Sequence, residues 1–163
     1  MSELVPMAIK GLMLDPVSNS PIVVLKDAAE KCFLPIWVGI FEANAIALQL
    51  ENITTPRPMT HDLLRNAIKE LDAHVSRVVI NDLRDSTFFA QIGLVIGNRT
   101  LELDARPSDA IALALRVAAP IFVAQAVLDQ AQTISPELEA DQEEKMKKWF
   151  DNMENEDFGK YKM

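Results

Sequence analysis

Short apolar stretches separated by turn residues run along the first part of the chain. Residues 8–14 and 22–26 predict two strands, because the intervening segment is filled with Asp, Pro, Ser and Asn. Residues 33–40 predict a third strand, in which alternate side chains share one face. A helix is then predicted from Glu42 to about Leu50. The first part of the chain therefore predicts the order strand, strand, strand, helix.

The same order recurs later. Residues 75–83 and 88–96 predict strands joined at Asp85 and Ser86, and residues 100–104 predict a third strand after a Gly-Asn turn. A helix is predicted from about residue 107 to 118, and a short strand at residues 121–123 follows. Residues 45–50 (AIALQL) nearly repeat residues 110–115 (AIALAL). These parallels indicate an internal duplication, and they predict an α+β fold with a mixed or antiparallel sheet and packed helices.

A rigid connection with Pro56 and Pro58 separates the two parts. After it, Thr60 is predicted to cap a helix over residues 61–72. The apolar residues of this helix share one face at helical spacing. They are Leu63, Leu64, Ala67, Ile68 and Leu71.

The chain changes character at Pro136, so residues 1–135 are predicted to form one domain and residues 136–163 an acidic amphipathic C-terminal helix or tail. Six residues form one stripe on this predicted helix. They are Leu138, Gln142, Met146, Trp149, Phe150 and Met153. The stripe needs a partner, which is either the domain's own core or another subunit.

Composition narrows the function classes. The 163 residues include 49% hydrophobic residues and carry a net charge of −8, which favours a folded domain and argues against a general nucleic-acid coat protein. This acidic composition is still compatible with an enzyme that binds cations between its carboxylates and a polyanionic substrate. Cys32 is the single cysteine, which suits a reducing cytoplasm. We expect neither a signal peptide nor a membrane span, because the apolar stretches are short.

The first candidate site lies at the junction between the strand at residues 100–104 and the following helix. Glu102 and Asp104 are two residues apart and therefore share one side of the strand, and Asp109 falls in the first helical turn. Three converging carboxylates would suit Mg²⁺ or Mn²⁺. Arg106 has the planar donor geometry that suits phosphate, and Ser108 could donate to phosphate or cap the helix. The sequence thus predicts metal ligands, phosphate contacts and catalytic roles for Asp104 and Asp109.

The second candidate site comprises His61 and Asp62, with Arg57 as a possible phosphate contact. A neutral histidine can accept a proton near pH 7, so His61 and Asp62 are candidate catalytic residues. Both sites also have a purely structural explanation. An acidic residue in the first turn of a helix stabilises the helix through its dipole alone.

Three ordered motifs resemble the bifunctional nuclease domain family. They are residues 34–47, residues 57–64 (RPMTHDLL) and residues 104–114 (DARPSDAIALA), within a similarity that extends from about Val5 to Ala131. Residues 150–161 also resemble the tail of bacterial members. The resemblance implies DNase and RNase activity, which is attributed to plant members, together with a duplicated α+β fold and self-association.

Two functions therefore remain as hypotheses. One is a metal-assisted phosphodiesterase that acts on RNA and DNA, in which carboxylates hold the ion and arginine contacts phosphate. The other is a non-catalytic, homo-oligomeric binding or regulatory module, which the acidic composition and the amphipathic final segment favour. In that case Arg106 and Asp109 would connect helix to strand or subunit to subunit.

Overall fold

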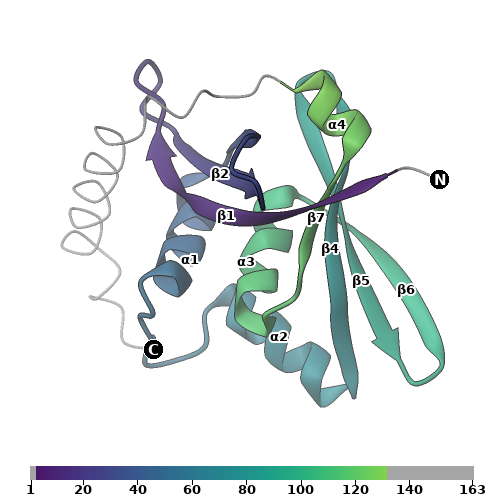
Figure 1. Ribbon diagram of the computed structural model, residues 1–163. Coiled ribbons are helices and arrows are strands. Elements are labelled where there is room, and N and C mark those ends of the chain that lie inside the picture. The colour runs from purple at the N-terminus through teal and green to yellow at the C-terminus, as the bar shows by residue number, and fades with distance from the viewer. Residues whose placement is uncertain (1–2, 132–163) are drawn as a thin grey trace.

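A seven-stranded mixed sheet in the order β3-β2-β1-β7-β4-β5-β6 forms the framework of the protein. The computed structural model describes residues 3–131 (Figure 1). The strands are β1 (Leu4–Leu14), β2 (Pro21–Asp27), β3 (Phe33–Trp37), β4 (Ala73–Arg84), β5 (Thr87–Ile96), β6 (Arg99–Ala105) and β7 (Ile121–Ala124). The helices are α1 (Ile40–Leu50), α2 (Thr60–Glu70), α3 (Pro107–Val117) and α4 (Gln125–Gln130).

The sheet consists of two three-stranded meanders joined by β7. Strands β1, β2 and β3 pair antiparallel and lead into α1, and strands β4, β5 and β6 do the same and lead into α3. Strand β7 pairs antiparallel with β1 and parallel with β4. The predicted α+β class and the repeated strand, strand, strand, helix order are confirmed.

Helices α1, α2 and α3 gather in the corner between the two meanders, which run in different directions in Figure 1. The near-repeated segments of the sequence lie at the centre of this arrangement. Residues 43–48 of α1 and residues 110–114 of α3 are all buried, and the two helices contact each other. Every second residue in both segments is alanine, between larger Asn, Ile and Leu side chains. The repeat therefore encodes the helical centre of the core.

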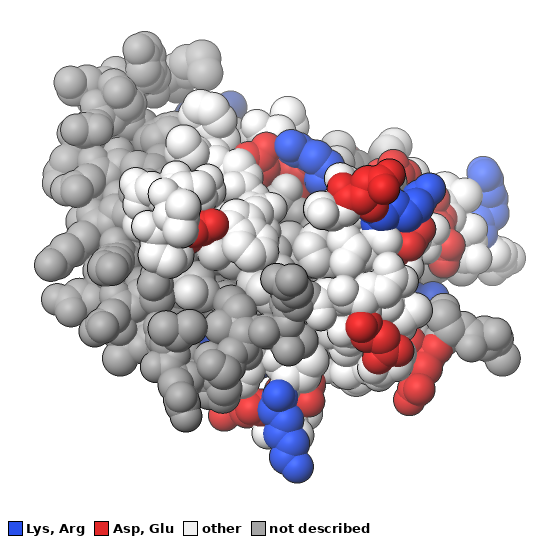
Figure 2. Space-filling view, turned by 90° about the horizontal axis from the view of Figure 1, so that it is seen from above, with Lys and Arg blue, Asp and Glu red and all other residues white. Residues whose placement is uncertain are grey.

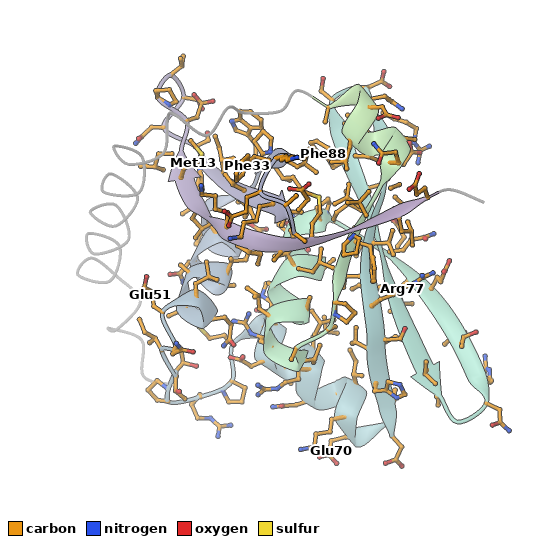
Figure 3. The ribbon with its side chains drawn as sticks, in the orientation of Figure 1. Met13, Phe33, Glu51, Glu70, Arg77 and Phe88 are labelled. Atoms are coloured by element: carbon orange, nitrogen blue, oxygen red, sulfur yellow. The ribbon has the colours of Figure 1, made fainter. Side chains whose placement is uncertain are left out.

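Strand β2 is buried on both faces, which explains its continuous apolar sequence. Val23 and Leu25 belong to the main core, whereas Ile22 and Val24 point to the other face and pack with Phe33. Met13 borders this smaller cluster, and Figure 3 labels it beside Phe33.

Several predicted boundaries are wrong. The third strand ends at Trp37 and α1 begins at Ile40, because the chain turns at Gly39, before the predicted strand is complete. Met59, and not Thr60, precedes the first residue of α2. The sequence also failed to predict α4.

The apolar residues of α2 do not form the predicted buried face. Ile68 is the one buried residue of this helix, whereas Leu63 and Leu71 are 62% and 70% exposed. The amphipathic helix predicted at residues 136–163 lies outside the described residues. Within residues 3–131, none of the helices has the length and apolar character needed to cross a bilayer.

Candidate functional site

Side chains from the beginnings of three helices meet in one cluster. Arg106 immediately precedes α3, and its Nη2 lies 2.7 Å from Glu42 Oε1, in the first turn of α1, and 2.8 Å from Asp109 Oδ2, in the first turn of α3. The other oxygen of Asp109 lies 2.9 Å from His61 Nε2, in the first turn of α2. We call Glu42, His61, Arg106 and Asp109 the helix-start cluster. It joins residues from three separate parts of the sequence.

The hydrogen bonds of the helix-start cluster determine which of its atoms donate and which accept. The Asp109 carboxylate can only accept, so the hydrogen between it and His61 lies on Nε2, and Nδ1 of a neutral His61 is left able to accept a proton. Arg106 also donates from Nε to Asp109, over 3.0 Å. The bonds to Asp109 and then Glu42 raise the pKa of Arg106. The cluster therefore pairs an oriented histidine with a fixed positive charge.

Burial differs across the helix-start cluster. The side chains of His61 and Glu42 are 13% and 17% exposed, whereas the Arg106 side chain is 66% exposed. Nε and Nη2 of Arg106 are occupied by the two carboxylates, and Nη1 makes no hydrogen bond with the described residues. Arg106 is thus held from one side and presents donors to solvent on the other.

Gly39 makes room for the Glu42 carboxylate. Gly39 is the residue before α1, and a Cβ placed on it would collide with Oε2 of Glu42. The carboxylate therefore lies close over the beginning of its own helix, where the helix dipole favours a negative charge. The missing side chain at Gly39 lets Glu42 remain there while it contacts Arg106.

Asp62 pairs with Arg116, whereas its neighbour His61 belongs to the helix-start cluster. Its Oδ1 accepts from Arg116 Nε over 2.7 Å, and its Oδ2 accepts from the Met59 N–H over 3.0 Å. Burial works against ionisation of Asp62, but the bonds from Met59 and Arg116 lower its pKa below the ordinary value. Asp62 is therefore an anchor for Arg116 and for the start of α2, and the structure gives its predicted catalytic role no support.

The sequence analysis missed Arg116, although its side chain is more buried than any other in the helix-start cluster or in the Asp62–Arg116 pair. It is 1% exposed and also donates to the backbone carbonyls of Ala112 and Ala45, over 2.9 and 3.1 Å. It thereby connects α3, α2 and α1. Its position directly after a continuous apolar helix sequence was the signal that could have revealed it, because a charge there is buried only with partners.

The predicted metal-binding group of Glu102, Asp104 and Asp109 is not assembled. Glu102 lies across β5 from Arg77, which Figure 3 labels on β4, and the two side chains are 3.9 Å apart over Gly93. Asp104 is exposed on β6. Among residues 3–131, no three His, Cys, Asp or Glu side chains are arranged to hold a metal ion. The reason is that Glu102 and Asp104 are exposed on β6, where Glu102 lies near Arg77, whereas Asp109 is bound by His61 and Arg106.

Ser108 and Arg57, both predicted phosphate contacts, lie in different surroundings. Ser108 is only 6% exposed, so its predicted phosphate contact is not supported. Arg57 is exposed in the connection between α1 and α2 and lines a pocket there. The pocket lies on the Asp62 side of the first turn of α2, and the helix-start cluster lies on the His61 side.

Charge is mixed elsewhere on the surface. On the face seen in Figure 2, the described Lys and Arg side chains lie beside Asp and Glu side chains instead of forming one continuous basic area. A nucleic acid on this face would meet little net attraction.

Residues 23–136 match the model of the bifunctional nuclease domain. The chain belongs to this family. The bifunctional nuclease domain therefore includes the whole helix-start cluster and Arg57 of the connection after α1.

Relatives of this family member come from bacteria and plants. An uncharacterized protein of Mycobacterium tuberculosis is 40% identical over 91% of this chain and 94% of its own length. Bifunctional nuclease 1 of Oryza sativa is 30% identical over 67% of this chain, and bifunctional nuclease 2 of the same species is 27% identical over 70%. This chain covers 34% and 36% of these two rice proteins. The similarity to the plant nucleases is thus restricted to about a third of their length.

Proposed function

We propose that this protein hydrolyses phosphodiester bonds of RNA and DNA at the helix-start cluster. Membership of the bifunctional nuclease domain family supports a nuclease. The observation that carries the proposal is the contact of His61 with Asp109, whose second oxygen is bound by the exposed Arg106. A proton acceptor that activates water and a cation that binds the phosphate are two groups that promote hydrolysis of a phosphodiester.

In the proposed reaction, His61 Nδ1 accepts a proton from the water that attacks phosphorus. The bond from phosphorus to the leaving oxygen breaks, and that oxygen takes a proton from solvent. Asp109 holds the imidazole ring through Nε2 and stabilises the imidazolium that forms. The Nη1 donors of Arg106 bind the phosphate oxygens as negative charge develops, and Glu42 fixes the guanidinium.

The requirement for a divalent ion is a separate proposal. Mg²⁺ or Mn²⁺ was predicted from the carboxylates at residues 102, 104 and 109, and these do not form a single ligand group. The proposed proton transfer to His61 therefore involves protein side chains and water alone. Assays with Mg²⁺, with Mn²⁺ and with chelator address the ion directly, since loss of activity in chelator would establish a metal-assisted reaction.

The experiment compares purified full-length variants on single-stranded RNA and DNA. We expect His61→Gln and Asp109→Asn each to lower the rate on the order of a hundredfold or more, because general base catalysis is lost. Asp104→Asn provides a matched carboxylate control, since Asp104 is exposed and forms no bond with the described residues. Equal activity of the wild type, His61→Gln and Asp109→Asn would refute the site. Circular dichroism and thermal melting confirm that each variant is folded.

A second candidate function is a homo-oligomeric binding or regulatory module. The exposed apolar face of α2, which includes Leu63 and Leu71, favours it, because such a stripe usually marks a contact surface. We expect light scattering to give the mass of a dimer or larger assembly, and Leu63→Lys to reduce that mass. A monomeric wild-type protein would exclude self-association through this face.

A further inference from the structure

A pocket of about 380 Å³ lies between the connection after α1, the first turns of α2 and the buried Arg116. Its volume is at the lower end of the range for small-molecule sites. The lining residues are Leu48, Gln49, Ile53, Thr54, Thr55, Pro56, Arg57, Pro58, Asp62, Arg65 and Arg116. The pocket is therefore of a size for one small ligand or one unit of a polymer.

The pocket lining is positive, although the protein is acidic. Three arginines and one aspartate line it, giving a local balance of +2 in a chain of net charge −8. Arg116 and Asp62 neutralise each other at 2.7 Å. Arg57 and Arg65 form no ion pair with the described residues, and Arg65 only helps to lower the pKa of Asp62 through its charge, so both guanidinium groups can still bind an anion.

The backbone holds Arg57 in place. Pro56 and Pro58 restrict the dihedral angles on both sides of it, and the Thr55 hydroxyl donates to the Arg57 carbonyl over 2.8 Å. Arg65 Nε donates to Asn66 Oδ1 over 3.2 Å, which leaves its terminal nitrogens for a ligand. Two guanidinium groups on a restrained framework suit a phosphate group with several acceptor oxygens.

The remaining lining suits the uncharged part of a nucleotide. Leu48 and Ile53 provide apolar surface, and Gln49 and Thr54 provide hydrogen-bonding groups. An apolar surface with a few polar groups is typical of sites that bind a flat heterocycle or a sugar. The pocket thus combines a phosphate-binding side with a side for a nucleoside.

We propose that this pocket binds one nucleotide unit of the nucleic acid strand, with its phosphate on Arg57 and Arg65. This inference rests on the proposed nuclease function. Asp62 lines the pocket, and the adjacent His61 contacts Asp109 in the helix-start cluster. A strand with one nucleotide in the pocket would therefore continue past the first turn of α2 toward His61, where the next phosphodiester would lie.

The test measures binding of adenosine 5′-monophosphate to the full-length protein by calorimetry, with adenosine and inorganic phosphate in parallel. The monophosphate contains no phosphodiester, so the measurement does not depend on catalysis. We expect Arg57→Gln and Arg65→Gln each to weaken its binding about tenfold or more, through loss of a charge-assisted bond. Arg99→Gln removes the same charge at the exposed start of β6 and should leave binding unchanged.

The inference would be overturned by no binding of the monophosphate, by equal binding of the monophosphate to both pocket variants and the wild type, or by inorganic phosphate that binds as tightly as the monophosphate. Adenosine is expected to bind more weakly than the monophosphate, and equal binding would also refute the phosphate contact. His61→Gln should retain the monophosphate. If the monophosphate binds at Arg57 and Arg65 but the protein cleaves neither RNA nor DNA, only the proposed nuclease function is rejected. If the protein cleaves nucleic acid but does not bind the monophosphate, only the inference about the pocket is rejected.

Discussion

Replacing Arg116 by methionine should destabilise the fold severely, because this side chain connects three helices from a buried position. Its side chain is 1% exposed, and the guanidinium donates to Asp62 and to the carbonyls of Ala112 and Ala45. Methionine fills part of the same space but donates no hydrogen bond. Arg116→Met therefore leaves the Asp62 carboxylate, itself 15% exposed, without its cation.

The magnitude follows from what remains around Asp62. Removal of one partner from a buried ion pair costs about 3–5 kcal/mol. Asp62 keeps the bond from Met59 and some contact with water, and both carbonyl acceptors lie within helices, where they already accept a backbone bond. We therefore expect a loss near the lower limit, about 3 kcal/mol, in the free energy of unfolding.

Urea unfolding at pH 7, followed by circular dichroism, measures this loss. Arg99→Met is the matched control, since the same change at an exposed position should alter the free energy of unfolding by less than about 0.5 kcal/mol. In the double variant with Asp62→Asn, the combined loss should be smaller than the sum of the single losses, because both changes break one interaction. A loss for Arg116→Met equal to that for Arg99→Met would refute the reasoning.

Other predictions concern pH and two glycines. Because the folded-state pKa of Asp62 is lowered from 3.8, its ionised form stabilises the fold above about pH 4, and that contribution is lost as pH falls through the lower folded-state value. Urea unfolding at several pH values should thus show the difference between wild type and Asp62→Asn narrowing below pH 4. Gly39→Ala should displace the flexible end of Glu42 and lower the proposed nuclease activity as much as Glu42→Gln does, while the melting temperature changes little. Gly93→Ala should cost about 1–3 kcal/mol, because its Cβ would lie 2.6 Å from Ser76 Oγ, and Ser76→Ala should recover most of that loss in urea unfolding.

Much of the fold was predictable because the sheet has strong local signals. Asp85 and Ser86 both adopt positive φ angles, 49° and 62°, as a two-residue hairpin connection requires. Alternation and turn residues located all seven strands to within a few residues. The exposed stripe of Leu63, Ala67 and Leu71 on α2 misled the prediction, because periodicity identifies an apolar face without identifying what covers it.

The candidate site was predictable only as residue types at helix starts. His61, Arg106 and Asp109 were selected from their positions, but the sequence favoured Glu102 and Asp104 as partners of Asp109, and the structure provides His61 instead. The sequence predicted Glu42 only as the first residue of a helix, and the arginine that it binds is 64 residues away. Local spacing cannot indicate which distant helix start lies beside another.

The amino-acid sequence by itself determined the duplicated order of strands and helices, since turn chemistry and side-chain periodicity act over a few residues. It also determined which helices would be central, because residues 45–48 and 110–114 are too apolar to face water. Only the tertiary structure decided the partners of the charged groups. The pairing of His61 with Asp109, and of Asp62 with Arg116, depends on how three helices pack in the corner of the sheet. That packing is the outcome of all the buried contacts together, so no single segment of the chain encodes it.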